Sequence, residues 1–207
     1  MKFRFYALQI TILCLLVFIV QLIIPRLTDL FILDSRAYHE IWRFLTSIFL
    51  HASVAHLLYN AFALVLFGSI LELMIGGKRF LAVFFISGIL ANLVAVNFYS
   101  SSLGASGAIY GVLGALILIR PFLFVWAFGL PMPMIVAGAL WVTGDIIGIF
   151  APSGVANIAH LAGIFIGLIL GAFFRPYYKK LFGEGDKSRP FILDEDRVRA
   201  WEDYYLR

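Results

Sequence analysis

The sequence predicts an all-α membrane protein, a bundle of six transmembrane helices with a membrane-embedded first loop. Hydrophobic residues make up 62% of the 207 positions, and charged residues make up only 14%. Soluble domains are about half apolar and about a quarter charged. Several apolar runs also approach the ~20 residues that a helix needs to cross a bilayer. The composition therefore excludes a soluble globular protein for all but the charge-rich end of the chain.

Six apolar segments form this architecture, and charged or helix-breaking residues separate them. The first is longer than the ~7–15 apolar residues of a signal peptide, so we expect it to be retained. The expected spans are residues 5–24, 53–75, 80–98, 106–119, 134–150 and 156–174. Residues 1–175 then form one six-helix domain. Because residues 175–207 hold 15 of the 28 charged residues, we expect 176–207 to form a charged cytoplasmic tail, a solvated appendage rather than a binding module.

Two connecting segments are expected to lie at the membrane interface. In residues 25–50, charged side chains alternate with Leu, Phe, Ile, Tyr and Trp. This pattern predicts amphipathic helical turns in the headgroup region, and an ordinary structured connection is the alternative. Residues 123–133 are aromatic and contain three helix breakers, Gly129, Pro131 and Pro133.

The distribution of Lys and Arg predicts the orientation. One side, with the N-terminus, residues 76–79, Arg120 and the tail, carries 13 of them, and the side of the 25–50 loop carries 3. By the positive-inside rule, both termini are cytoplasmic. We therefore expect a multi-pass protein of the cell membrane, whose net charge of +4 reflects membrane flanks and not a nucleic-acid site. Ser106 then begins its helix from the outer side.

Ser106 is the first candidate for chemistry. It lies between the small residues Gly104 and Gly107 at the head of a long apolar segment. A helix N-terminus offers unpaired backbone N–H groups and the positive end of the helix dipole. Both would stabilise the oxyanion that forms when a serine hydroxyl attacks a carbonyl group. Taken alone, the Gly-x-Ser-Gly tetrapeptide is more typical of helix packing, because small residues are common where transmembrane helices meet.

His160 is a candidate base for that serine. Gly163, Gly167 and Gly171 follow it on one helical stripe. Such a stripe would let the sixth span press against the fourth and bring the imidazole to Ser106. An interhelical hydrogen bond at a packing seam is the structural alternative.

His56 and Asn60 are four residues apart and share one face of the second span. They could be metal ligands, a second base or donors to an oxyanion. No His-Glu-x-x-His motif and no third strong ligand accompany them, so no metal is expected. Side-chain N–H groups aimed from one helical face fit the oxyanion role better. Cys14 is the single cysteine, so no intrachain disulfide can form.

Five segments together resemble the rhomboid family of intramembrane serine proteases. Each is a weak match alone, but all five occur in the family's order within residues 1–175. They are the Trp42-Arg43 pair with Glu40, the His-x4-His-x3-Asn pattern of His51, His56 and Asn60, Gly68-x3-Glu72, residues 104–107 with Tyr110, and the segment 159–167 that contains His160 and Gly163. Ala162 stands where the family often has glycine.

The resemblance implies a Ser–His dyad with Ser106 as nucleophile and His160 as general base, then acid. The Ser106 backbone N–H, the Asn60 amide and the His56 imidazole would form the oxyanion hole. Tyr110 would pack against His160 and hold the imidazole. Supporting positions are Gly104, Gly107, Gly163 and His51, and the first-loop signature is Glu40, Trp42 and Arg43.

The same resemblance implies that no acidic third member accompanies the dyad. The acids within the expected spans are Glu72 and Asp145, and burying a carboxylate beside the base would be costly in a membrane. The implied partners are the lipid bilayer and transmembrane protein substrates, cut near the outer face where their helices unwind. No cofactor is implied, and no oligomeric state is predicted.

Three other functions remain as alternatives. An inactive relative would bind transmembrane clients without cutting, but it would be expected to lack Ser106 or His160. A transporter would also have glycine-rich helices with polar interiors, although no inverted repeat is evident. An aspartyl intramembrane protease would use Thr143-Gly144-Asp145, but it needs two aspartates that share a proton, and no second transmembrane Asp exists.

Overall fold

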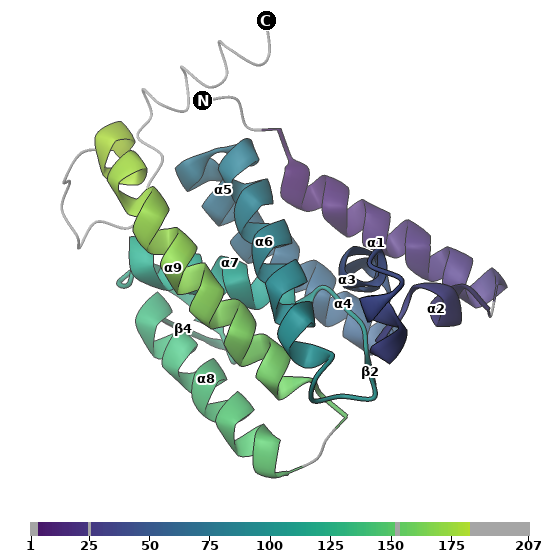
Figure 1. Ribbon diagram of the computed structural model, residues 1–207. Helices are drawn as coiled ribbons and strands as arrows, with labels where there is room; N and C mark the ends of the chain where they lie inside the picture. Colours follow the sequence, from purple (N-terminus) through teal and green to yellow (C-terminus); the bar gives the residue numbers. More distant parts are fainter. Residues whose placement is uncertain (1–3, 25, 152–153, 183–207) are drawn as a thin grey trace, which may run out of the picture.

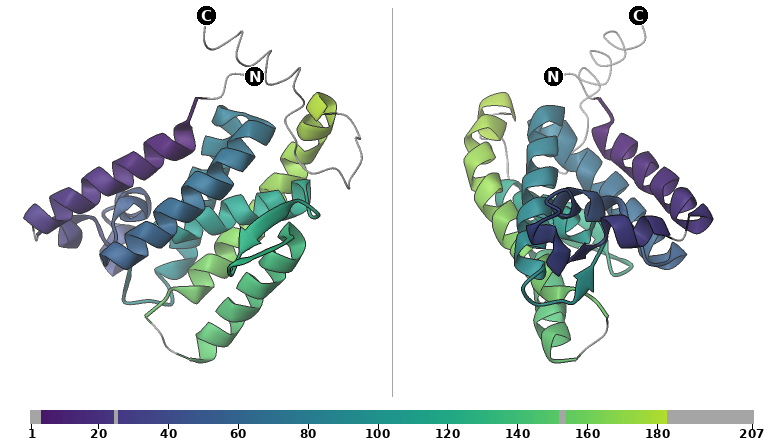
Figure 2. Two further views of the ribbon diagram at one scale, coloured as in Figure 1. Left: turned by 180° about the vertical axis from the view of Figure 1, so that it is seen from behind. Right: turned by 45° about the vertical axis from the view of Figure 1, so that its right-hand side comes forward.

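The computed structural model describes residues 4–24, 26–151 and 154–182, which fold into a bundle of helices (Figure 1). The α-helices are α1 (Tyr6–Ile23), α2 (Arg26–Phe31), α3 (Arg43–Thr46), α4 (Val54–Ala63), α5 (Ser69–Ile75), α6 (Gly77–Ala95), α7 (Ser106–Ile119), α8 (Met134–Phe150) and α9 (Asn157–Phe182). Short 3-10 segments are η1 (Ser35–Tyr38) and η2 (Ser47–Phe49), and a π-helical turn is η3 (Leu64–Gly68). In Figures 1 and 2, α1 lies on one flank, α8 and α9 lie on the other, and α6 runs between them.

Four helical segments of the described chain are long and apolar enough to cross a membrane. They are Tyr6–Ile23, Val54–Ile75, Gly77–Ala95 and Asn157–Lys179. Two shorter apolar helices, α7 and α8, occupy the positions of the fourth and fifth expected spans. The protein is thus a multi-pass helical membrane protein, with four helices of spanning length and two shorter ones, α7 in the centre and α8 on a flank.

The second span contains a π-helical turn where it packs against α1. Residues 64–68 connect α4 to α5 without a break in helical direction. At Gly68 a Cβ atom would lie 3.0 Å from the Cβ of Ala7 and 3.0 Å from the Cδ1 of Leu64. Glycine therefore allows α1 to approach this turn closely.

A buried carboxylate fixes the start of α1. Glu72 on α5 is 1% exposed and accepts hydrogen bonds from the backbone N–H groups of Arg4 (3.2 Å) and Ala7 (3.1 Å). The first N–H groups of a helix have no partner within the helix. Glu72 supplies one from another span, which explains a carboxylate inside an apolar segment.

The central helix is α7, and ten of its fourteen residues are buried. Glycines let α9 lie directly on it. A Cβ atom at Gly163 would lie 2.1 Å from the carbonyl oxygen of Gly107, and one at Gly167 would lie 2.0 Å from that of Gly111. The backbones of α7 and α9 are therefore in contact along the glycine stripe.

The all-α prediction omits two small antiparallel sheets. Strands β1 (Leu33–Asp34) and β2 (Ser101–Ser102) pair, with Leu33 opposite Ser102. Strands β3 (Phe124–Ala127) and β4 (Leu130–Pro133) form a hairpin where only an irregular interfacial segment was expected. The hairpin turn has positive φ at both Phe128 (54°) and Gly129 (78°), which is the geometry of a tight two-residue hairpin turn.

Helix α9 continues past its expected end at residue 174. It reaches Phe182 with Pro176 inside it. Proline removes one backbone hydrogen bond, and the helix tolerates that loss here. The remainder of the expected tail, residues 183–207, lies outside the described residues.

Candidate active site

The structure brings Ser106 and His160 together. Ser106 is the first residue of α7, and His160 lies in the first turn of α9. Ser106 Oγ and His160 Nε2 are 2.8 Å apart and hydrogen-bonded. This separation is within the range in which a base can take the proton of a nucleophile.

The start of α9 is fixed by its neighbours, and this places the imidazole. The hydroxyl oxygen of Tyr99 accepts a hydrogen bond from the backbone N–H of Ile158 (3.0 Å). One turn further, Gly163 lies against the backbone of Gly107. These two contacts hold the first turn of α9 beside the N-terminus of α7.

Tyr110 lies one helical turn after Ser106, and its ring stacks on His160. The ring centroids are 4.2 Å apart and the planes are inclined by 13°. Stacking on one face restricts the tilt of the imidazole. The hydrogen bond to Ser106 then directs Nε2 toward the serine hydroxyl.

The expectation that no carboxylate accompanies the base is wrong. Asp145 on α8 lies beside His160, with Oδ1 2.9 Å from His160 Nδ1. Its side chain is 5% exposed. The cost of burying a carboxylate was the reason to exclude it, but a hydrogen bond to an imidazole that can become positive offsets that cost. Ser106, His160 and Asp145 thus form a continuous hydrogen-bonded chain.

Gly104 makes room for His56. Its φ of +118° lies in the region that favours glycine, and a Cβ atom there would lie 2.7 Å from Cε1 of the His56 ring. The same imidazole packs edge-on against His51, with centroids 5.1 Å apart. Gln21 fixes the backbone of His51, accepting a hydrogen bond from its N–H (3.0 Å).

Asn60 lies one helical turn after His56 on the same face of α4 and is buried. Its Nδ2 donates a hydrogen bond to the carbonyl oxygen of His56 at 3.0 Å. An amide nitrogen carries two hydrogens, so one remains for another acceptor. The structure places His56 beside the loop that precedes Ser106, and it places Asn60 one turn away.

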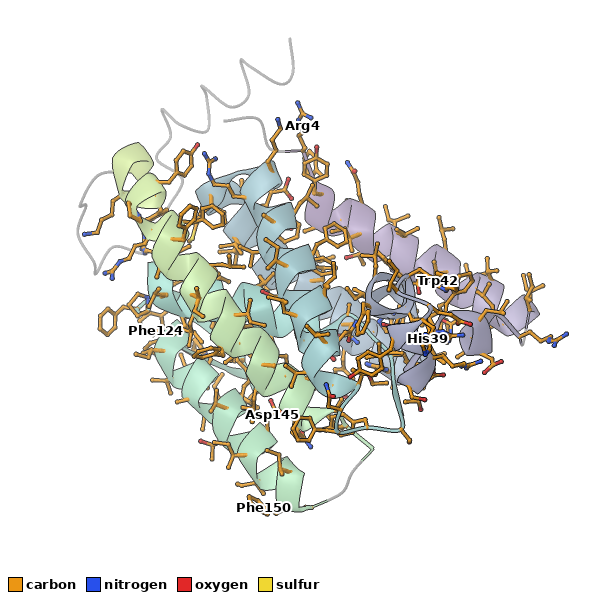
Figure 3. All side chains as sticks on the ribbon, viewed as in Figure 1. Arg4, His39, Trp42, Phe124, Asp145 and Phe150 are labelled. Atoms are coloured by element: carbon orange, nitrogen blue, oxygen red, sulfur yellow. The ribbon has the colours of Figure 1, made fainter. Side chains whose placement is uncertain are left out.

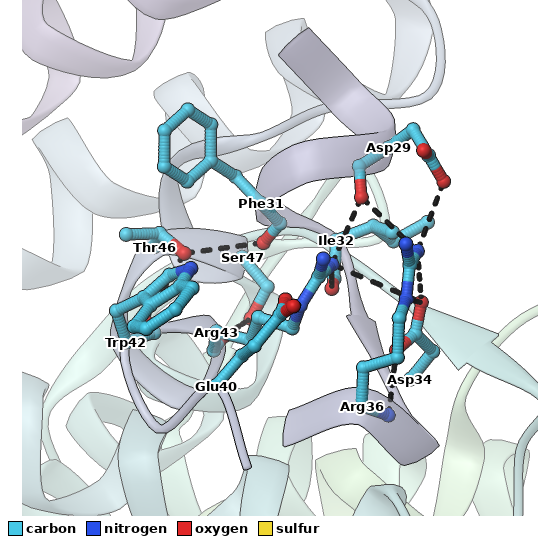
Figure 4. A network of polar contacts seen from close by, with 10 residues as sticks. All are labelled: Asp29, Phe31, Ile32, Asp34, Arg36, Glu40, Trp42, Arg43, Thr46 and Ser47. Atoms are coloured by element: carbon cyan, nitrogen blue, oxygen red, sulfur yellow. Dashed lines mark hydrogen bonds and ion pairs between the residues drawn. The ribbon is translucent and has the colours of Figure 1, made fainter. Parts of the chain in front are cut away.

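The first loop is organised around Arg43, which is 1% exposed (Figure 4). Its Nη1 donates to the backbone carbonyl oxygens of Asp29 (2.9 Å) and Ile32 (2.8 Å), and its Nε donates to Glu40. Trp42 is half exposed, and the figure shows its ring beside Thr46. Of the three signature residues, Arg43 and Glu40 hold the loop together, and Trp42 presents an aromatic ring at its surface.

This loop connects directly to the segment that precedes Ser106. The backbone N–H of Gly104 donates to the carbonyl oxygen of Ser47 at 2.9 Å. Asn92 on α6 donates from Nδ2 to the carbonyl oxygen of Phe44 (2.8 Å) and to Ser47 Oγ (3.0 Å). Together with the β1–β2 pairing, these bonds fix the position of Gly104.

Four contributors to the site were missed from the sequence. Asp145 had a signal, because an ionisable residue inside a membrane span is by default a functional candidate. Tyr99, Asn92 and Ser47 had none, because their partners are distant in the chain. Within the described residues, no three His, Cys, Asp or Glu side chains cluster as metal ligands.

These features define a class: a helical multi-pass membrane protein with a serine, a histidine and an aspartate in hydrogen-bonded series at the end of its central helix. The Rhomboid domain family matches residues 38–177, about two thirds of the chain. The chain therefore belongs to the Rhomboid family.

Several relatives share this domain. Rhomboid protease GluP of Bacillus subtilis (strain 168) is 37% identical over 141 residues, which cover 66% of this chain and 26% of that protein. RHOMBOID-like protein 1 of Arabidopsis thaliana is 34% identical over 144 residues, 68% of this chain and 36% of that protein. Rhomboid protease GlpG of Yersinia pestis (strain Pestoides F) is 27% identical over 180 residues, 79% and 60% respectively. The chain thus spans from about a quarter to three fifths of the length of these relatives.

Proposed function

We propose that this protein is an intramembrane serine endopeptidase, with Ser106 as nucleophile and His160 as base. The observation that supports this most directly is the 2.8 Å hydrogen bond between Ser106 Oγ and His160 Nε2. Membership of the Rhomboid family and the names of two relatives, GluP and GlpG, support the same reaction class.

In the first step, His160 Nε2 takes the proton of Ser106 as Oγ attacks the carbonyl carbon of a peptide bond. The tetrahedral intermediate collapses when the same proton passes from Nε2 to the leaving amine, which breaks the C–N bond. A water molecule then loses a proton to Nε2 and attacks the acyl-enzyme ester. Release of the carboxyl product returns the hydrogen to Ser106 Oγ.

The oxyanion hole is proposed to consist of the Ser106 backbone N–H, the Asn60 amide and the His56 imidazole. The N–H of Ser106 is at the first position of α7, where it lacks a partner within the helix. Asn60 has a second Nδ2 hydrogen to donate. His56 lies against Gly104, two residues before the nucleophile. Donors that converge on a developing negative charge lower the barrier by several kcal/mol.

In the membrane we propose six spans, with both termini cytoplasmic and Ser106 on the outer side of the cell membrane. The 14 residues of α7 measure about 21 Å at 1.5 Å per residue, and the apolar core of a bilayer is about 30 Å thick. If α7 ends at the cytoplasmic boundary, Ser106 lies roughly 10 Å below the outer one. Labelling of Ser101→Cys, in a Cys14→Ser background, by an impermeant maleimide added to intact cells tests this orientation. Labelling only after lysis would contradict it.

The substrates are proposed to be transmembrane segments of other membrane proteins, cut near their outer ends. A peptide bond inside a helix is shielded by side chains, and its carbonyl oxygen is already hydrogen-bonded. Ser106 can reach it only where the helix unwinds. Small or helix-breaking residues near the outer face would permit that unwinding.

The experiment that tests this function measures cleavage of a single-span substrate by the purified protein in lipid vesicles. We expect cleavage by the wild type and losses of at least about 10³-fold in Ser106→Ala and His160→Ala. Ser101→Ala, which removes an exposed hydroxyl from neighbouring β2, is the matched control and should cleave normally. Cleavage that survives Ser106→Ala would reject the assignment. Substrate binding without cleavage by the wild type would instead favour an inactive rhomboid-like protein that binds transmembrane clients.

A further inference from the structure

The carboxylate of Asp145 is the one member of the hydrogen-bonded series that the mechanism above does not use. In Figure 3 the labelled Asp145 lies between α8 and α9. Its Oδ1 is 2.9 Å from His160 Nδ1, and its buried Oδ2 meets the geometry of a hydrogen bond with no atom of the described residues. A carboxylate buried in an apolar bundle is costly unless it is paired. Its position beside the base therefore indicates a role in the reaction.

The protonation of the imidazole follows from this contact. When Asp145 is ionised, its carboxylate only accepts hydrogen bonds, and the hydrogen between Asp145 and His160 is then on Nδ1. A neutral imidazole carries one N–H group, which leaves the lone pair on Nε2. That atom is the one 2.8 Å from Ser106 Oγ. Without an acceptor at Nδ1, the ring could place its hydrogen on Nε2, where it cannot accept the serine proton.

We propose that Asp145 is a positioning residue that holds His160 in the tautomer able to accept the Ser106 proton and stabilises the imidazolium that forms. This inference rests on the proposed serine-protease function. When the Oγ–H bond breaks and the Nε2–H bond forms, the imidazolium gains its positive charge beside the carboxylate. Asp145 keeps its negative charge throughout and takes no proton.

Two other titratable side chains face this pair. Tyr110 on α7 stacks on the imidazole and interacts electrostatically with Asp145. His56 on α4 interacts electrostatically with His160. Within the described parts of the chain, His160 is the basic side chain that pairs with Asp145, and the Tyr110 hydroxyl also interacts with this carboxylate by hydrogen bonding. An imidazolium at His160 would thus be the positive charge available to this carboxylate.

A purely structural role, in which Asp145 only anchors α8 to α9, makes a different prediction. The two helices also meet where the side chain of Asn157 lies against Gly148, so their packing does not depend on one hydrogen bond. A structural anchor would affect the amount of folded protein. A positioning residue would affect turnover by protein that is already folded.

The first test compares Asp145→Asn with wild type in lipid vesicles, using a single-span substrate. Asparagine keeps the shape but not the charge. We expect kcat to fall by at least about 30-fold, with KM changed less than about threefold and the thermal midpoint within a few degrees of that of the wild type.

The matched control is Glu72→Gln, a buried carboxylate-to-amide change far from the site. It should lower the thermal midpoint and leave the kcat of folded protein near that of the wild type. Wild-type kcat in Asp145→Asn, or a loss that only follows the loss of folded protein, would overturn the positioning role.

The second test needs no substitution at Asp145. In protein labelled with 15N-histidine, the ring shifts of His160, assigned by their absence in His160→Ala, report which nitrogen carries hydrogen. We expect a protonated Nδ1 and an unprotonated Nε2, and a neutral ring protonated on Nε2 would overturn the inference. The outcomes separate the two proposals. Normal turnover by Asp145→Asn beside an inactive Ser106→Ala removes only the positioning role, whereas absence of cleavage by wild type removes the proposed function.

Discussion

At the scale of single residues, a glycine two residues before Ser106 provides the space that the His56 ring needs. Gly104 has no Cβ, and a Cβ there would lie 2.7 Å from Cε1 of the His56 ring, too close for a normal contact. We expect Gly104→Ala to displace His56 and to strain the backbone at a φ of +118° by about 1–3 kcal/mol. Because misplacing a catalytic group by ~1 Å can cost about 100-fold in rate, vesicle cleavage should fall at least about tenfold.

The control for this change is Gly129→Ala, at the hairpin turn. Gly129 also has positive φ (+78°), but a Cβ there meets no atom of the described residues within 4 Å. The Gly129→Ala variant therefore has the backbone strain but lacks a collision like that between a Cβ at Gly104 and the His56 ring. Equal cleavage rates for the two variants would show that the contact with His56 has no importance for the site.

A second prediction at this scale concerns pH. Burial, with a smaller contribution from His56, lowers the pKa of His51 from 6.5 to about 4. Between these values the unfolded chain takes up a proton that the folded protein does not. The free energy of unfolding should therefore decrease as pH falls from 6.5 to 4, by at most about 1.4 kcal/mol per pH unit for this group.

Thermal unfolding in detergent between pH 4 and 7.5 checks this. The midpoint of His51→Gln should depend less steeply on pH than that of the wild type. His39→Gln, at an exposed position of the first loop, should keep the wild-type slope. A His51→Gln profile parallel to that of the wild type would contradict the burial argument.

At this scale, the sequence pointed to candidate site residues where a residue type is uncommon in its surroundings. A serine between glycines, a histidine at the head of a glycine stripe and the acid Asp145 all stand out in apolar segments. The partner of Asp145 could not be predicted, because it depends on the rotation of α8 about its axis. The hydrogen bond to His160, which offsets the cost of burying the carboxylate in the membrane, is visible only in the structure.

At the scale of elements, the contact between α7 and α9 sets the distance between Ser106 and His160. A Cβ at Gly167 would lie 2.0 Å from the carbonyl oxygen of Gly111, so Gly167→Ala must push the helices apart. We expect a loss of about 1–3 kcal/mol in unfolding free energy and slower cleavage, measured by thermal unfolding and the vesicle assay.

The matched control is Gly144→Ala on α8. A Cβ at Gly144 meets nothing within 4 Å, and alanine favours a helix over glycine by up to about 1 kcal/mol. This variant should be as stable as the wild type or more stable. If Gly167→Ala were equally stable, the glycine stripe would not be a packing seam.

Element boundaries were predictable where the chain has strong stops. Helices α7 and α8 begin and end at the expected residues because Arg120–Pro121 and Pro133 interrupt the apolar pattern. The β3–β4 hairpin was not predicted, because Phe128 adopts positive φ there and a non-glycine residue rarely does so. The end of α9 was missed for a similar reason, since Pro176 usually ends a helix.

At the scale of the whole molecule, a short central helix is enclosed by longer ones, and the first loop is tied to the segment before Ser106 by the β1–β2 pairing and Ser47. Hydropathy predicted six membrane spans, whereas four helical segments of the described chain are long and apolar enough to cross a membrane. Helix α7 has its expected bounds and is too short to cross a full bilayer. Length decides that point, because 14 residues cover about two thirds of the apolar thickness. The nucleophile can therefore lie below the surface and still be at the end of a helix.

In the proposed function, the Ser106 hydroxyl is an activated nucleophile because His160 accepts its proton. Reaction with a serine-directed fluorophosphonate probe, followed by mapping of the modified peptide, measures this most directly. We expect one modified residue, Ser106, with labelling lost in Ser106→Ala and His160→Ala and retained in Ser101→Ala. Undiminished labelling of Ser106→Ala, or modification mapped to any other residue, would contradict it.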